Sequence, residues 1–126
     1  MMAALTPPLA LDFVTALSAD ITAAVVLDNG GALLAGEPAL ADPARALLAT
    51  APRASQLEGR TGDGAVYAAR DSKHAIVVVT GRFALGRLTR HDLRTALSAL
   101  GGQSGPQEPP APVPDAAVRA CIDSHA

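Results

Sequence analysis

Two runs of five consecutive apolar residues, at positions 23–27 and 75–79, constrain the fold of this 126-residue chain more than any other feature. A strand with one face in water alternates polar and apolar residues, whereas a strand that is apolar at every position must be covered on both faces. Neither run approaches the roughly 20 apolar residues that a membrane-spanning helix needs. The sequence therefore predicts two central strands, in a sheet with helices on both of its faces.

Turn residues beside these runs indicate which strands pair. Asp28-Asn29-Gly30-Gly31 favours a tight turn, because Asn and Gly accept positive φ angles. Residues 32–36 should therefore return beside the first central strand. Residues 65–70 should form a second hairpin with residues 75–80.

The remaining predicted strand, residues 55–60, places Gln56, Glu58 and Arg60 on one face. A strand with one polar face belongs at the edge of the sheet, where its backbone is open to a second copy of the chain. The fold class predicted is α/β: a three-layer sandwich with a central five-stranded, mainly antiparallel sheet of strand order 2-1-5-4-3 and helices on both faces.

Three helices complete the predicted domain. The first begins near Pro8, with Leu9, Phe13, Ala16 and Leu17 on one face. The second begins at Asp42-Pro43, an acidic N-cap followed by a first-turn proline, and ends before Pro52. The last begins at Thr89, where Thr89 and Asp92 resemble a capping box, and its buried stripe is formed by Leu93, Ala96, Leu97 and Leu100.

A change of composition at Gly101-Gly102 divides the chain. Residues 1–102 are predicted to form a single domain, and residues 103–126 hold five of the ten prolines. Chain of that composition favours extended, unpacked conformations, so we expect a disordered tail or, as the alternative, a peptide that docks on a partner. Within the tail only residues 116–122 carry an apolar cluster, with Val118 and Ile122 four positions apart.

Composition and motifs exclude several function classes. The net charge of −2 offers no basic excess for nucleic acid, and a single cysteine, Cys121, excludes a disulfide within the chain. Residues 1–5 contain no basic residue, so we expect no secretory signal and a cytoplasmic protein that does not bind membranes.

Residues that carry catalysis or bind cofactors are not evident either. The glycine-rich residues 59–64 lack the Lys-Ser/Thr pair of a phosphate-binding loop, and His74, His91 and His125 do not have metal-ligand spacing. We therefore predict no catalytic, cofactor-binding or metal-binding residues. Four arginines near the last helix form either a solvated face or a surface for an acidic partner: Arg82, Arg87, Arg90 and Arg94.

The order of elements, together with two segments, resembles the roadblock (dynein light-chain) domain family. Residues 25–36, a strand that ends in Asp-Asn-Gly-Gly and resumes as apolar, are similar to that family's first hairpin. Residues 83–88, followed by Arg90, Leu93 and Leu97, are similar to its approach to the last helix. The resemblance covers residues 8–101.

This resemblance implies a non-catalytic cytoplasmic module of the bacterial type, associated with Ras-like small GTPases or other signalling proteins. Family members form homodimers through the middle helix and the strand after it, so that one sheet extends across both subunits. By position, the interface would use Leu40, Leu47, Leu48, Gln56, Leu57 and Glu58. The alternative function is a small-molecule sensor domain of the PAS or GAF type, although a chain with 2% aromatic residues offers little to line a ligand pocket.

Overall fold

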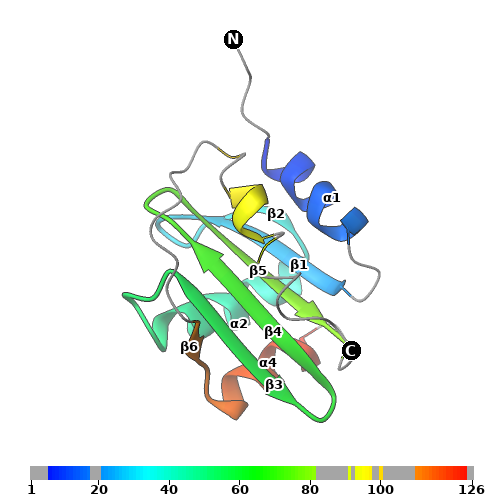
Figure 1. Cartoon of the computed structure of the whole chain (residues 1–126), viewed down its shortest axis with the longest axis vertical. Coiled ribbons are helices and arrows are strands. Elements are labelled where there is room, and N and C mark those ends of the chain that lie inside the picture. Colours follow the sequence, from blue (N-terminus) through cyan, green and yellow to red (C-terminus); the bar gives the residue numbers. More distant parts are fainter. Residues whose placement is uncertain are drawn as a thin grey trace.

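One twisted sheet with helices on both faces forms the body of the molecule (Figure 1). The computed structural model describes residues 6–17, 21–81, 91, 93–97, 100 and 110–124. The named elements in chain order are α1 (Pro7–Leu17), β1 (Ile21–Asp28), β2 (Leu33–Gly36), α2 (Pro38–Ala49), β3 (Gln56–Thr61), β4 (Gly64–Arg70), β5 (His74–Thr80), β6 (Ala111–Pro112) and α4 (Asp115–Asp123).

The order of the strands is β2-β1-β5-β4-β3-β6. The predicted order of the first five strands is confirmed, and so are the two hairpins: β1 pairs with β2, and β4 pairs with β5, both antiparallel. The prediction of five strands is wrong by one. β6 pairs with β3 in parallel, so β3 is not an edge strand and the sheet is mixed.

The central strands β1 and β5 are buried on both faces, as their composition predicts. Val25 and Val77, which are opposite each other in the register, belong to one hydrophobic cluster together with α2 and α4. Their neighbours Val26 and Val78 belong to a second cluster on the other face, together with α1 and residues 93–97. All four valines have no exposed surface, which confirms a three-layer arrangement.

The face of α1 that packs against the sheet differs from the predicted one. Ala10 is completely buried, whereas Leu9 is 53% exposed and Ala16 is also exposed. Phe13 is half-buried and contacts the same cluster as Ala10. Most residues of α1 are apolar, so the pattern does not define a polar side that could orient the helix.

The start of α2 also differs from the prediction. The helix begins at Pro38, after Glu37, whose carboxylate accepts the N–H of Ala39 at 3.4 Å. Asp42-Pro43 therefore lies inside α2 and not at its start. Glu37-Pro38 and Asp42-Pro43 are both an acidic residue followed by proline. Glu37 forms the cap because it follows β2 directly.

The predicted stripe of the last helix is confirmed where it is described. Leu93, Ala96, Leu97 and Leu100 are all buried in the cluster that contains Val78. The predicted start at Thr89 with Asp92 lies outside the described residues, and so do Arg82, Arg87 and Arg90.

The C-terminal region is ordered where the structure describes it. Residues 110–124, called the C-terminal segment below, form β6 and α4, and α4 packs against α2, β3 and β4. The prediction of disorder is therefore wrong for these residues, because Val113, Val118 and Cys121 are buried in the core. The division of the chain at Gly101-Gly102 stays a prediction.

Candidate functional site

The six residues of the predicted interface lie in α2 and β3, as expected, but most of them do not reach the surface. Glu58 is half-buried. The other five are buried within the chain itself: Leu40, Leu47, Leu48, Gln56 and Leu57. A homodimer that uses these side chains stays a proposal, and it requires a change in what covers them.

The C-terminal segment is what covers β3 on its outer side. In the register Leu57 is opposite Ala111, and Glu58 is opposite Pro112. The backbone N–H of Val113 donates to the carbonyl of Glu58 at 3.2 Å. The outward backbone of β3, which the sequence left open to a second copy, is therefore partly engaged by the chain itself.

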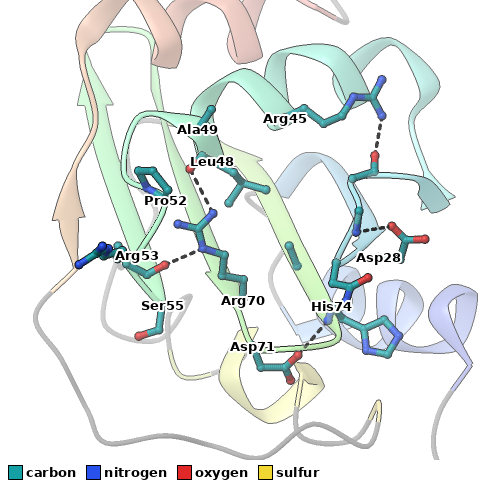
Figure 2. Close-up of a pocket in the computed structure, with 15 residues that line it drawn as sticks. Asp28, Arg45, Leu48, Ala49, Pro52, Arg53, Ser55, Arg70, Asp71 and His74 are labelled. Atoms are coloured by element: carbon teal, nitrogen blue, oxygen red, sulfur yellow. Dashed lines mark hydrogen bonds between the residues drawn. The ribbon is translucent and has the colours of Figure 1, made fainter.

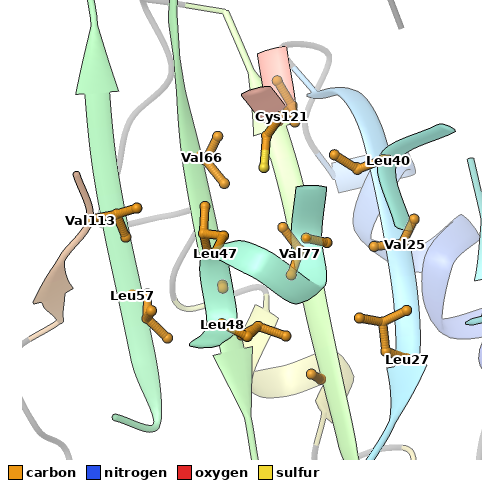
Figure 3. Packing of buried hydrophobic residues seen from close by; sticks show 14 of the residues in the cluster. Val25, Leu27, Leu40, Leu47, Leu48, Leu57, Val66, Val77, Val113 and Cys121 are labelled. Carbon is orange, nitrogen blue, oxygen red and sulfur yellow. The ribbon is translucent and has the colours of Figure 1, made fainter. Parts of the chain in front are cut away.

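Side chains of the C-terminal segment belong to the same hydrophobic cluster as the leucines of α2. Figure 3 shows Val113 beside Leu47 and Leu57, and Cys121 near Val66. Burial raises the pKa of the Cys121 thiol to about 11, so the thiol stays protonated at neutral pH. The packing is close at Gly59, where an added Cβ would lie 2.4 Å from Cγ2 of Val118.

A second feature is a cavity of about 640 Å³ beside the end of α2 (Figure 2). Its walls come from four separate parts of the chain: the β1–β2 turn, the last turns of α2, the loop before β3 and the β4–β5 turn. The ionisable residues that line it are Asp28, Arg45, Arg53, Arg70, Asp71 and His74.

Arg70 builds one wall of the cavity, and each of its three side-chain nitrogens donates a hydrogen bond. Its Nε donates to the carbonyl of Ala54 at 2.7 Å, and one terminal nitrogen donates to that of Leu48 at 3.1 Å. The other terminal nitrogen donates to Ala51. These carbonyls lie at and beyond the C-terminal end of α2, where a cation compensates the negative end of the helix dipole. Burial lowers the pKa of Arg70.

The β4–β5 turn contributes two buried polar atoms for which no hydrogen-bond partner is found. Oδ1 of Asp71 accepts the backbone N–H groups of Lys73 and His74 at 2.7 and 2.8 Å. Oδ2 of Asp71 and Nδ1 of His74 are buried without a partner. Buried polar atoms are normally satisfied, so both are candidates for contact with a bound molecule.

This cavity was not predicted from the sequence. The spacing of His74, His91 and His125 in the sequence argues against a metal site, and within the described part of the chain no group of three or more His, Cys, Asp or Glu residues could hold a metal ion. The sequence features that indicate this cavity are the two turns, Asp28–Gly31 and Asp71–His74, which the strand order 2-1-5 places at the same end of the sheet.

Among the described residues, the structure contains no helix that is long and apolar enough to cross a membrane.

No protein-family model and no curated protein sequence matches the chain, but solved structures do. A Roadblock/LC7 domain from Streptomyces avermitilis is 18% identical, with a TM-score of 0.58 over 71% of this chain and 93% of that one. The gliding protein MglB from Thermus thermophilus is 18% identical, with a TM-score of 0.56 over 72% and 82%.

Two further structures widen the comparison. MglB with a tetrameric arrangement is 18% identical, with a TM-score of 0.57 over 72% of this chain and 82% of that one. Profilin II from Acanthamoeba castellanii is 15% identical, with a TM-score of 0.52 over 76% and 98%. At such identities the likeness concerns the fold, which these proteins share with this chain.

Proposed function

We propose, from the Roadblock/LC7 fold of the chain, that this protein is a non-catalytic scaffold or regulator that binds a Ras-like small GTPase or another signalling protein. The observation that carries the proposal is the shared fold with Roadblock/LC7 and MglB structures. It agrees with the resemblance in residues 25–36, which form the β1–β2 hairpin.

A regulator of this kind acts by choosing between conformations of its partner. If it binds one state of the partner's switch segments more tightly, it shifts their population by the difference in affinity. A tenfold preference supplies about 1.4 kcal/mol. The regulator itself needs no catalytic residue, because its effect comes from binding alone.

An arginine that reaches into the partner's active site would add catalysis to such binding. Three arginines lie near the proposed surface. Arg45 donates to the carbonyl of Gly31 at 2.7 Å, and Arg60 donates to the hydroxyl of Tyr67 at 2.6 Å. Arg53 is exposed, in the loop before β3, and is the arginine best placed to reach a partner.

The assembly proposed is a homodimer through α2 and β3, with the interface of Leu40, Leu47, Leu48, Gln56, Leu57 and Glu58. Support comes from the MglB structure described as tetrameric, which shows that a protein of this fold self-associates. A standard interface would bury about 800 Å² per partner.

GTP turnover tests the regulatory role. We expect the protein to hydrolyse no GTP alone and to change the turnover of a Ras-like GTPase from its own organism. Arg53→Ala separates the two modes of action: turnover that depends on Arg53 indicates an arginine supplied to the partner, whereas unchanged regulation indicates selection of a conformation. Turnover by the protein alone would contradict the proposal.

A second candidate function, a small-molecule sensor, is favoured by the cavity beside α2. Its volume lies in the range of ligand sites, and Oδ2 of Asp71 would accept a hydrogen bond from an amine, amide or hydroxyl group.

Ligand-induced stabilisation tests the sensor function. At a concentration one hundred times the Kd, a ligand should stabilise the fold by about 2.7 kcal/mol, measured as a rise in melting temperature across a panel of polar metabolites. Asp71→Asn should abolish the rise, because it keeps Oδ1 for the turn but replaces the free acceptor, while Asp63→Asn in another turn should not. A panel in which nothing raises the melting temperature would exclude this function.

A further inference from the structure

The C-terminal segment does two things that a second molecule could do. Its strand β6 continues the sheet beyond β3, and its helix α4 packs beside α2 on the same face of the sheet (Figure 1). The segment therefore occupies both the edge and the adjoining helix surface, which together form one continuous docking site.

The segment depends on this docking for its own structure. α4 has nine residues and β6 has two, and an isolated helix of fewer than about 12 residues is marginal in water. Three side chains anchor it in the core: Val113, Val118 and Cys121. Loss of one anchor should therefore release the segment, whereas the sheet keeps its second core of Tyr67, Val78 and Leu93 on the other face.

Release of the segment would uncover the outward backbone of β3 as the edge of the sheet. The carbonyl of Glu58 points away from β4, since it accepts from Val113, so the backbone groups of alternate residues Gln56, Glu58 and Arg60 face outward. An open edge of this kind is a template for another strand.

The charges on β3 favour a second copy of this chain as the alternative occupant. If two β3 strands pair antiparallel about Gly59, Glu58 of each copy lies opposite Arg60 of the other, on the same face of the sheet. Opposite charges at facing positions stabilise a strand pair, and both ion pairs form at once because a two-fold interface repeats each contact.

We infer that the C-terminal segment is an intramolecular cover that competes with a second copy of this chain for the surface of α2 and β3. The closed chain is a monomer, and the homodimer proposed above, joined through β3, forms only when the segment is released. This inference rests on the proposed function only for the identity of the surface; it adds the device that regulates self-association.

Cys121 reports whether the segment is docked, because it is the one cysteine of the sequence and is buried in α4. On release its pKa should return from about 11 to its ordinary value of 9.0. The thiolate fraction near pH 8 then rises about a hundredfold, and the rate of reaction with a thiol reagent rises by about tenfold or more, because a thiolate of lower pKa is a weaker nucleophile.

The experiment compares Val118→Asp with Ala120→Asp in the full chain. Both place a charge on α4, but Val118 is completely buried and Ala120 is exposed. We expect the wild type and Ala120→Asp to sediment as monomers with slowly reacting thiols. Val118→Asp should sediment as a dimer, with a thiol that reacts about tenfold faster or more.

A second variant weakens the docking of the segment without changing the segment's own sequence. The Cβ of Gly59→Ala would lie 2.4 Å from Cγ2 of Val118 and 3.2 Å from Cβ of Val113, so Val118 must shift and the docked state should become less stable. Glu58→Lys, added to either variant, should weaken the dimer because it places like charges opposite each other.

Three results would overturn the inference. One is a Val118→Asp chain with a reactive thiol that stays a monomer. Another is a wild-type dimer whose thiol remains protected. The third is loss of cooperative unfolding in both Val118→Asp and Gly59→Ala, which would make the segment an inseparable part of the core. Binding to a GTPase is measured separately, so a dimer that binds no GTPase contradicts the proposed function and leaves this inference intact.

Discussion

Replacement of Val78 by aspartate should leave the chain unable to fold. Val78 has no exposed surface and lies in the central strand β5, between β1 and β4. A carboxylate there would be buried without a partner, at a cost of several kcal/mol, in a protein whose total stability is about 5–15 kcal/mol. Val77→Asp should have the same effect from the opposite face of the sheet.

Leu34→Asp is the matched control, because it also places aspartate in a strand but at a residue that is 39% exposed. Circular dichroism during heating should show a cooperative transition for Leu34→Asp and none for the two valine variants. A cooperative transition near that of the wild type in both valine variants would contradict the burial of β5 on both faces.

Gly36→Ala should be the most damaging single-methyl substitution among the described glycines. Gly36 has a φ of +112°, and a Cβ built on it would lie 2.2 Å from the carbonyl oxygen of Ala24 and 2.7 Å from Cα of Val25. That carbonyl accepts the N–H of Glu37 at 3.1 Å, so the backbone cannot easily move away. We expect a loss of about 2–5 kcal/mol from strain and overpacking together.

Gly62→Ala provides the comparison, because nothing lies within 4 Å of its added Cβ. Its free energy of unfolding should change by about 0.5 kcal/mol or less. Urea denaturation measures both variants. Equal stability of Gly36→Ala and Gly62→Ala would show that β2 approaches β1 less closely than these distances indicate.

The sheet could be predicted from the sequence because its signals are local and agree. Residues 23–27 and 75–79 are apolar throughout, and each is followed or preceded by a turn that permits one hairpin. Local turns decide which strands pair, and composition decides which strands are central. The remaining strand, β3, lies beside β4 because a short turn joins the two strands, with Thr61 opposite Gly64.

The helices were predicted less well, because their signals compete. Glu37-Pro38 and Asp42-Pro43 are equivalent start signals five residues apart, and only the position of β2 selects the first. In α1, Leu9 and Ala10 are both apolar, and the packing against β1 and β2 decides that Ala10 is buried.

The C-terminal segment shows the limit of composition as a guide. Its prolines favour extended chain, and Pro112 does lie in a strand, β6. Val118 and Ile122 have the spacing of one helical turn, but the sequence does not reveal that β3 and α2 provide an apolar surface for such a turn. The cavity could not be predicted from the sequence either, because its lining residues come from four separate parts of the chain.

Affinity for a Ras-like GTPase in its two nucleotide states tests the central claim most directly. Calorimetry of the full chain with the GTPase, loaded with GDP or with a non-hydrolysable GTP analogue, gives both dissociation constants. We expect them to differ by about tenfold or more, which is about 1.4 kcal/mol of selection between states. Equal affinity for both states, or no binding to either, would contradict the proposed regulatory role.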